Sequence, residues 1–392
     1  MIARIAVFIF LMILLPEWYI YRVHVRRRGQ MVRWKMVLWW VPAAVLSCYT
    51  VVLCLIPGFA PAEQMLLNVY LLLFGLFALP KVAFMLCSLI GIGVRRLFRL
   101  RRNYGTLMGI ALSVVLVIGV LYGSFVGSRR LVVKHVEIAF SDLPASFDGY
   151  RIVHISDLHV GSMDSSFLAR AVDSINAQHA DAVMMTGDLQ NMQPSELAPY
   201  GELLRRLCAR DGVFSVLGNH DYSMYVAAPD SVKAANDSAV VRQERSYGWR
   251  LLLNSHVTVR RGADSIVVAG EQNGGHRPFP MKADLRKTLA GVAPGTFVVL
   301  MQHDPWSWEN RILPQSDVQL TLSGHTHGGQ VSVMGLRPTQ FTCKEDCGLY
   351  VRGTRALFVS SGLGGFVPFR LGVYPEIVTI TLKVKKVFLE VL

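Results

Sequence analysis

Five short polar clusters in the second half of the chain carry the side chains that could do chemistry. They are Asp157-Leu158-His159, Gly187-Asp188, Gly218-Asn219-His220-Asp221, His303-Asp304 and Gly324-His325-Thr326-His327. Each cluster follows an apolar run of strand-like composition, and ligands of α/β sheets bind beyond the carboxyl ends of strands. One such cluster arises easily by chance. Five in this order predict a single shared site.

The types of side chain in these clusters indicate metal binding. The predicted ligands are Asp157, His159, Asp188, Asn219, His303, His325 and His327. Mixed oxygen and nitrogen ligands suit Mn, Fe or Zn, and the lack of a thiolate disfavours a structural zinc cage. Two ions about 3.5–4 Å apart can stabilise the attacking and leaving oxygens of a phosphoryl transfer. The alternative, that these residues are ordinary caps and turns, requires several independent motifs to coincide.

The segments that position these clusters alternate between strands and helices. Strands are expected at 151–155, 182–185, 213–217, 265–269, 296–301, 318–322, 357–359 and 377–383, with helices at 165–178 and 197–208. This alternation predicts an α/β domain. Gly187, Gly218 and Gly324 are expected to allow sharp turns and a close approach of the backbone to the ions. His154, within a strand, is expected to be a core histidine.

Four apolar stretches precede residue 130, at 2–23, 36–59, 65–94 and 106–126, within a chain that is 52% hydrophobic. A membrane-spanning helix needs about 20 residues, so four spans are expected. Pro16 and Glu17 interrupt the first stretch, which lacks the cleavage site of a signal peptide. Pro80 and Lys81 interrupt the third, where a kink is expected. The first interpretation of Lys81 is a position in helix packing, and the second is a functional site within the membrane.

The net charge of +13 follows from basic residues beside the apolar stretches. These residues are Arg22, Arg26, Arg27, Arg28, Arg33, Lys35, Arg95, Arg96, Arg99, Arg101 and Arg102. Their position predicts cytoplasmic loops and no nucleic-acid partner. The connection 57–64 has no Lys or Arg and is expected outside, which places both termini and the polar domain outside the cytoplasm. Arg129, Arg130 and Lys134 argue weakly for the opposite orientation.

Two of the six cysteines lie close together, in Cys343-Lys344-Glu345-Asp346-Cys347. Outside the cytoplasm this spacing favours a local disulfide. Free thiols are the second interpretation. A zinc site is the third, because no second pair of cysteines lies nearby.

The polar clusters resemble the calcineurin-like metallophosphoesterase superfamily over about residues 148–383. The segments that carry the resemblance are HISDLHVG, TGDLQN, LGNHDY, MQHDP and SGHTHGGQV. The apolar N-terminus and GLGGFVPFRLGVYPEI are similar to its membrane-associated bacterial branch, which includes UDP-2,3-diacylglucosamine hydrolase-type enzymes. The resemblance implies a two-sheet sandwich flanked by helices at 129–392. An all-helical transmembrane region at 1–128 would lie in a bacterial inner membrane.

The resemblance also implies a role for each site residue. Asp157, His159 and His327 would hold one metal ion, Asn219, His303 and His325 a second, and Asp188 would bridge both. His220 would donate a proton to the leaving oxygen with the help of Asp221, although a structural histidine is the alternative. Glu271-Gln272-Asn273 and Ser360-Ser361 depart from the family, where relatives often carry a Gly-x-Asp-Asp-like loop and an Arg. Both departures bear on substrate recognition.

Together these features predict hydrolysis of a phosphate ester at a membrane surface. A phosphodiester or pyrophosphate of a lipid or cell-envelope precursor is the leading substrate. A nucleotide phosphodiesterase or a phosphomonoesterase is the alternative within the enzyme class. A metal-binding membrane sensor or transporter is the alternative outside it, and the full ligand set together with His220 argues against that interpretation.

Overall fold

A computed structural model describes residues 2–26, 32–56 and 64–385 of the chain. It contains two compact units, Met1–Val126 and Gly127–Leu392. The predicted boundary at 128/129 lies close to this division, and the roles assigned to the two segments as domains stay a prediction. Each unit is described separately below.

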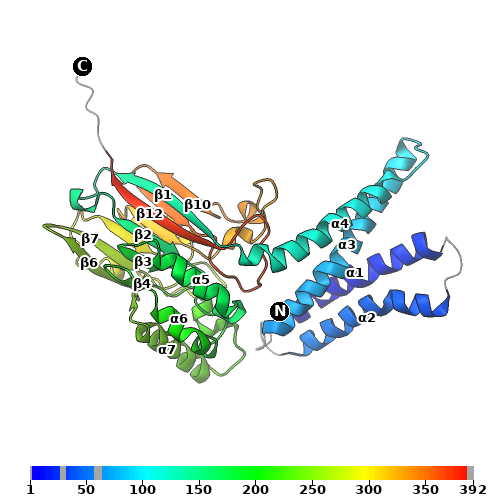
Figure 1. Cartoon of the computed structure of the whole chain (residues 1–392), viewed down its shortest axis with the longest axis horizontal. Helices are drawn as coiled ribbons and strands as arrows, with labels where there is room; N and C mark the ends of the chain where they lie inside the picture. Colours follow the sequence, from blue (N-terminus) through cyan, green and yellow to red (C-terminus); the bar gives the residue numbers. More distant parts are fainter. Residues whose placement is uncertain (1, 27–31, 57–63, 386–392) are drawn as a thin grey trace, which may run out of the picture. The chain divides into compact units, whose positions relative to one another are not determined.

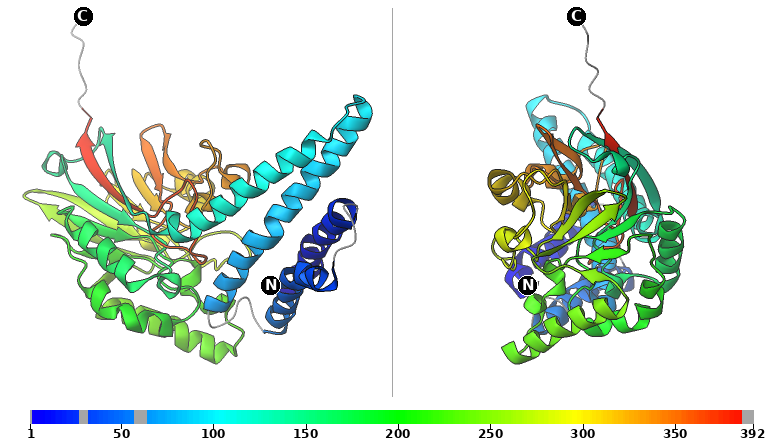
Figure 2. Two further views of the ribbon diagram at one scale, coloured as in Figure 1. Left: turned by 45° about the vertical axis from the view of Figure 1, so that its right-hand side comes forward. Right: turned by 90° about the vertical axis from the view of Figure 1, so that its left-hand side faces the viewer.

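Unit 1 is helical (Figure 2, blue to cyan). Its helices are α1 (Ile2–Ile20), continued by a π-helical turn (Tyr21–Val25), α2 (Arg33–Leu55), α3 (Gln64–Leu97) and α4 (Tyr104–Phe125). All four helices are long and apolar enough to cross a membrane, as the sequence predicted. Arg27, Arg28 and most of the connection 57–64, on which part of the predicted orientation depends, lie outside the described residues.

Unit 2 contains two six-stranded sheets (Figure 1). The first has the order β1 (Val132–Phe140), β12 (Glu376–Val384), β2 (Arg151–Ile155), β3 (Ala182–Met185), β4 (Val213–Ser215) and β5 (Arg250–Leu251). The second has the order β10 (Gly348–Arg352), β11 (Arg355–Val359), β9 (Leu320–Ser323), β8 (Val298–Met301), β7 (Asp264–Gly270) and β6 (Ser255–Arg261).

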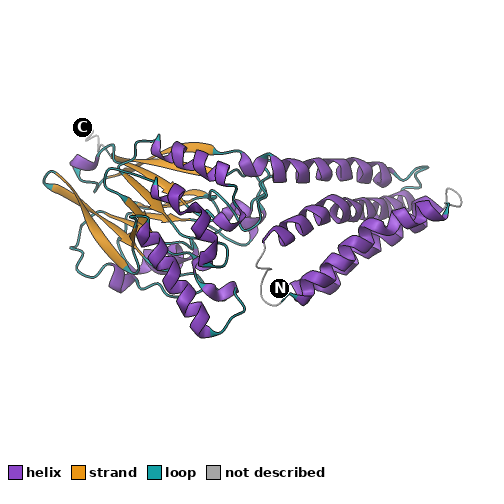
Figure 3. Ribbon diagram, turned by 60° about the horizontal axis from the view of Figure 1, so that its bottom comes forward, coloured by secondary structure: helices purple, strands orange, loops and turns teal. Residues whose placement is uncertain are grey.

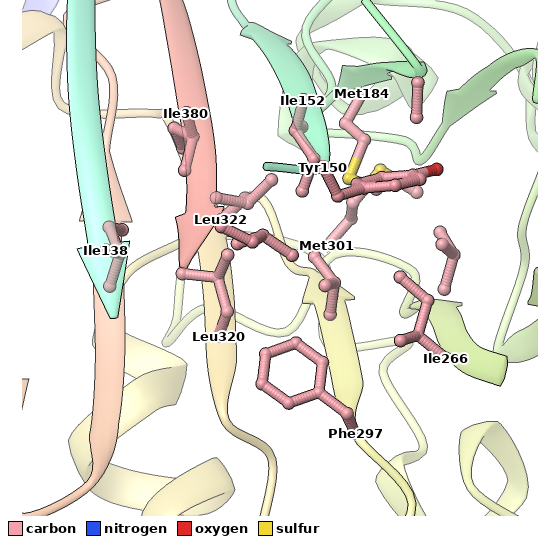
Figure 4. Close-up of a cluster of buried hydrophobic side chains, with 14 of the residues drawn as sticks. Ile138, Tyr150, Ile152, Met184, Ile266, Phe297, Met301, Leu320, Leu322 and Ile380 are labelled. Atoms are coloured by element: carbon pink, nitrogen blue, oxygen red, sulfur yellow. The ribbon is translucent and has the colours of Figure 1, made fainter. Parts of the chain in front are cut away.

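The inner strands are apolar on both faces, which explains why they were visible in the sequence. In β3, Ala182 and Met184 belong to the core between the two sheets, whereas Val183 and Met185 pack against the helices outside. Figure 4 shows the core, in which Met184 lies with Ile152 of the first sheet and Met301 of the second. Because both faces are packed, each inner strand is held in place, and so is the point at which its carboxyl end is reached.

Helices cover the outer faces of the sheets (Figures 1 and 3). They include α5 (Ser165–Asn176), α6 (Gly201–Arg205), α7 (Asp230–Ser246), α8 (Leu285–Thr288) and α9 (Leu313–Gln315). The helix predicted at 165–178 is α5, and its apolar residues Phe167, Leu168, Val172 and Ile175 are buried. The helix predicted at 197–208 is wrong as a single element, because a 3-10 helix (Pro194–Tyr200) precedes α6. Pro199 lies within it and cannot donate a helical hydrogen bond.

The strands that matter for the site are parallel within each sheet. β2 pairs with β3 and β3 with β4, and β8 pairs with β9, all in parallel. Their carboxyl ends are therefore followed by loops on one edge of each sheet. The predicted fold class is confirmed: an α/β two-sheet sandwich flanked by helices, preceded by a helical membrane region.

Candidate metal centre

The structure brings the five predicted polar clusters together at the carboxyl ends of β2, β3, β4, β8 and β9. Three groups of side chains have ligand atoms within 4.8 Å of one another: Asp157 with His159 and His327, His159 with Asp188 and His220, and Asp188 with His303 and His325. Asn219 joins the last group through its side-chain oxygen. All seven predicted ligands and His220 therefore lie in one cluster.

Backbone strain is concentrated in the same loops. Asp157, His159, Asp188, His325 and His327 have φ values of 51°, 47°, 57°, 72° and 52°. A non-glycine residue in this left-handed region costs on the order of 1 kcal/mol or more, and such residues gather at functional sites. The packing of the two sheets holds these residues in conformations that turn their side chains toward one another.

Two of the predicted glycines are required for close approach. A side chain on Gly218 would put its Cβ 2.2 Å from Asp188 Oδ1, and one on Gly324 would put it 2.2 Å from Asp157 Oδ2. Gly187 adds a positive φ of 96°. Larger residues at Gly218 and Gly324 would push the carboxylates out of the cluster, and one at Gly187 would collide with the backbone of Gly218.

Acceptor atoms converge at the first predicted ion position. His159 Nδ1 donates to Asn191 Oδ1 at 3.0 Å, so the lone pair of the neutral ring lies on Nε2. That buried Nε2 has no hydrogen-bond partner. Burial and the neighbouring His220 lower the pKa of His159 to about 3, which keeps the ring neutral. His327 Nε2, in the same group of potential ligands, lies 3.5 Å from Asp157 Oδ1. This arrangement fits a cation.

The second predicted position has the same character. Asn219 Nδ2 donates to Tyr225 Oη at 2.7 Å, which leaves Asn219 Oδ1 as an acceptor 2.7 Å from His325 Nδ1 and 3.1 Å from His303 Nε2. His303 Nδ1 donates to the Thr186 carbonyl at 2.7 Å, which turns Nε2 inward. Burial opposes a charge on His303, yet Asp188 raises its pKa to about 10. The surroundings therefore favour positive charge at this point.

Asp188 lies between the two groups. Its Oδ2 atom is 3.6 Å from His159 Nε2 and 3.1 Å from His303 Nε2. Burial acts to raise the pKa of Asp188, but the surrounding imidazoles hold it well below its usual range. A buried carboxylate that stays ionised between two sets of imidazoles is suited to bridge two cations.

His220 and Asp221 differ in what they contact. His220 Nδ1 donates to the Asn191 carbonyl at 2.6 Å, and its ring stacks on Tyr225 with centroids 4.4 Å apart. The Asp221 carboxylate instead accepts hydrogen bonds from four backbone amides, those of Asp188, Leu189, Gln190 and Gly218. None of these four hydrogen bonds joins the Asp221 carboxylate to the His220 ring, so the expected help of Asp221 to His220 would be indirect. Asp221 fastens the loop after β3 to the loop after β4.

Several residues that orient the site were not assigned from the sequence. Asn191 and Tyr225 set the orientation of His159 and Asn219, as described above. Arg370 is buried and donates to the carbonyl oxygens of His327 and Gly364, and burial lowers its pKa to about 10. Asn191 stood within TGDLQN, and Arg370 is a lone charge within the apolar run FVPFRLGV. Those two signals could have identified them.

The two departures from the family lie beside the site. The buried Glu271 carboxylate accepts from Gln302 Nε2 at 2.9 Å and from Arg311 Nη2 at 3.1 Å. Ser361 donates its backbone amide to Glu376 at 2.7 Å. Both segments are held by hydrogen bonds to other parts of unit 2, and neither supplies one of the predicted ligands.

The favoured disulfide between Cys343 and Cys347 is absent, because both residues are free thiols in the described part of the chain. Asp346 between them is held by Arg337 through hydrogen bonds of 2.6 and 3.0 Å. Burial raises the pKa of each thiol to about 11. The protonated thiol is a poor metal ligand and reacts slowly with oxidants.

Known proteins resemble both units. Residues 150–329 match the family described as calcineurin-like phosphoesterase, and residues 3–128 match the probable calcineurin-like phosphoesterase, transmembrane domain. The transmembrane protein with metallophosphoesterase domain of Danio rerio is 30% identical over 290 residues, which is 71% of this chain and 62% of that protein. The Bos taurus protein of the same description is 30% identical over 267 residues, 64% of this chain and 57% of its own length.

The chain thus spans less than two thirds of the length of these two relatives. Among solved structures, the phosphopantetheinyl hydrolase of Mycobacterium tuberculosis is similar with a TM-score of 0.37 and 13% identity, covering 56% of this chain and 91% of that protein. Members of the matched family use divalent metal ions. The chain therefore contains a calcineurin-like phosphoesterase domain at residues 150–329, preceded at residues 3–128 by a 4TM phosphoesterase domain.

Proposed function

We propose that unit 2 hydrolyses phosphate esters with two divalent metal ions. Asp157, His159 and His327 would hold the first ion, Asn219, His303 and His325 the second, and Asp188 would bridge them. The observation that carries this proposal is the convergence of Asn219 Oδ1, His303 Nε2 and His325 Nδ1 within 3.3 Å of one another. Outward hydrogen bonds to Tyr225 and Thr186 turn the first two of these atoms inward, so a cation between the three atoms would stabilise the arrangement.

The bound ions would supply positive charge for the phosphoryl oxygens and an activated nucleophile near neutral pH. Mn, Fe and Zn each suit this donor set of imidazole, carboxylate and amide oxygen. The chain's own contribution is to hold the donors rigidly. Asn191, Thr186 and Tyr225 fix the ligand side chains before any substrate arrives, which lowers the cost of organising the site.

His220 is proposed to protonate the leaving oxygen. Its Nδ1–H is held by the Asn191 carbonyl, so the proton available to a bound ester is on Nε2, on the opposite side of the ring. Tyr225 and Phe366 lie against the ring with centroids 4.4 and 5.6 Å away. These contacts limit its rotation. Asp221 acts as a positioning residue through the backbone and does not touch the ring.

The proposed substrate is a phosphodiester or pyrophosphate of a lipid or cell-envelope precursor. Support comes from the short connection to the membrane region, since α4 ends at Phe125 and β1 begins at Val132. A catalytic unit held so near a bilayer meets lipid-borne esters more often than soluble ones. Nucleotide phosphodiester and phosphomonoester hydrolysis remain the alternative activities within the same site.

A direct test uses the full-length protein in lipid nanodiscs, loaded with Mn, Fe or Zn and assayed on bis(p-nitrophenyl) phosphate. We expect two bound ions per chain by elemental analysis and hydrolysis that a chelator abolishes. Mass spectrometry of lipid and nucleotide phosphates incubated with the same sample then identifies the substrate class. Two tightly bound ions with no ester consumed from any class would instead support a metal-binding sensor.

We propose further that unit 2 faces away from the cytoplasm, in a bacterial inner membrane. The support is the basic composition of residues 95–102 and of the segment around Arg26 and Arg33. A reporter that is active only outside the cytoplasm, fused after Leu392, is expected to be active. Activity of a reporter that works only in the cytoplasm would reverse the orientation.

A further inference from the structure

A short hairpin follows the last predicted metal ligands and carries apolar residues at its tip. The backbone amides of Val333 and Leu336 donate to each other's carbonyl oxygens at 3.0 Å. Between them, Met334 and Gly335 have φ values of 53° and 85°. Two successive positive φ values define a type I′ turn, which normally contains Asn-Gly or Asp-Gly. Here the first turn position is a methionine.

The side chains at this tip are among the most exposed apolar groups of unit 2. Met334 is 99% exposed, Leu336 65% and Val333 58%, and the nearby Phe341 is 83% exposed. We call these four residues the apolar hairpin. Four large apolar side chains with this exposure, within nine positions of the chain, indicate an interaction surface.

The exposure does not result from a loosely attached segment. Ser332 N donates to the Leu371 carbonyl at 2.7 Å, and Leu371 N donates to the Gln330 carbonyl at 2.9 Å. On the other side of the tip, Arg337 makes two hydrogen bonds to Asp346. The hairpin is therefore held on both flanks with its apolar side chains pointing away from the unit.

The same flank of unit 2 receives the chain from the last membrane-spanning helix. Val132 N donates to the Pro375 carbonyl at 2.9 Å, and the Arg130 guanidinium lies 4.5 Å from the centre of the Tyr374 ring. Tyr374 is three residues from Leu371, which anchors the hairpin. Val132 comes seven positions after Phe125, the last residue of α4, so the chain between them can span at most about 24 Å. A bilayer surface is thus within reach of the hairpin.

We propose that the apolar hairpin inserts into the interface of the bilayer that the four helices span. The chemistry of the tip suits this partner, because Met, Leu, Val and Phe bind apolar lipid chains without a specific geometry. Insertion would also orient unit 2, since His325 and His327 lie only a few residues before the hairpin. This orientation matters for the proposed hydrolysis. The docking of the hairpin on the bilayer does not depend on that hydrolysis.

The test is oxidative footprinting of the unmodified full-length protein in nanodiscs that contain one copy each. Radicals generated in bulk water oxidise accessible methionines, and mass spectrometry measures the rate at each site. Met281, 60% exposed in the same unit, is a native reference. From side-chain exposure alone, Met334 should be oxidised faster than Met281. If the hairpin docks on the membrane, Met334 should be oxidised at least about 5-fold more slowly than Met281.

Equal or faster oxidation of Met334 in the disc would overturn the proposal. Protection that appears only in discs with two or more copies would assign the hairpin to self-association and would overturn it as well. A second measurement uses Met334→Asp and Leu336→Asp together, with the intensity of tryptophan fluorescence as a check of folding. In a folded variant, loss of docking should restore access to Phe341, which the same radicals also oxidise.

Discussion

The two units of this protein both bury ionisable side chains, and they balance the charge differently. In unit 1, Glu17 is 1% exposed and forms a salt bridge with Lys81, whose ammonium lies 5.5 Å from the Trp39 ring centre. In unit 2, two aspartates and five histidines form three groups whose potential ligand atoms lie within 4.8 Å of one another. The first set is one matched acid and base, whereas the second gathers enough potential ligands to hold a cation.

This difference separates a structural role from a binding role. A charge in the membrane costs several kcal/mol unless a partner neutralises it, so helices with a matched acid and base can pack together. Some other polar groups of unit 1 also pair between helices, as Tyr19 Oη donates to Ser88 Oγ at 2.9 Å. In the metal centre the outward hydrogen bonds of His159, His303 and Asn219 turn potential ligand atoms inward, where a bound ion would stabilise them.

The largest effect is expected from Asp188→Asn. An amide cannot neutralise two cations, so we expect loss of at least one ion and of about 10³-fold in kcat/KM. Elemental analysis and hydrolysis of bis(p-nitrophenyl) phosphate measure both quantities. Asp173→Asn, at an exposed salt bridge with Arg206, is the control and should keep both the bound ions and the turnover. Two retained ions with normal turnover would contradict the bridging role.

Next comes His220→Ala, which separates chemistry from metal binding. The variant should keep both ions and lose on the order of 10²-fold or more on an alkyl or sugar phosphodiester, because that leaving group needs a proton. The loss on a nitrophenyl ester should be much smaller, since nitrophenolate leaves without one. His179→Ala, at an exposed position, is the matched control. An equal loss on both esters, or a missing ion, would make His220 a ligand or a support.

A smaller effect is expected when a residue behind the ligands is changed. Tyr225→Phe removes the oxygen that accepts from Asn219 Nδ2 but keeps the ring beside His220. We expect metal affinity to fall by about 10-fold, as for other residues that orient ligands. Tyr222→Phe is the control, because its hydroxyl donates to Gln272. Competition with a fluorescent chelator measures the metal affinity of both variants. If the two variants bind metal equally well, Tyr225 does not have this role.

The smallest effect is expected from the salt bridge between Glu17 and Lys81 in unit 1. A double-mutant cycle of Glu17→Gln and Lys81→Met should give a coupling energy on the order of 1 kcal/mol in the unfolding of unit 1, as for polar contacts between membrane helices. Turnover of a soluble ester should not change in any of the three variants. A large loss of turnover with normal stability would show that the pair has a functional role, and the comparison drawn above would fail.

The sequence predicted the inner strands well because each is apolar on both faces and ends at a polar cluster. The strand at 151–155 and the strand at 182–185 have the predicted bounds. The edge strand β1 was not predicted, because its side chains are mostly half-buried or exposed and it follows a membrane span directly. Nor was α7, which buries only Val240 and Glu244 and so has almost no apolar face.

Within the site, sequence determined which residues could be ligands, because donor type and position after a strand are local properties. Only the tertiary structure decided how they are oriented. The contacts of His303 with Thr186 and of His325 with Asp157 join residues more than 100 positions apart. Asp221 shows the same limit, since its neighbour in sequence is His220 but its carboxylate binds amides of the loop after β3.

In unit 1 the sequence determined four membrane-spanning helices from length and apolar composition alone. Glu17 and Lys81 stood out there as two separate interruptions, in different stretches and 64 positions apart. The tertiary structure joined them into one salt bridge. Hydropathy is summed along a helix, whereas the cost of a buried charge depends on its neighbours in space, and those neighbours are set only when the helices pack.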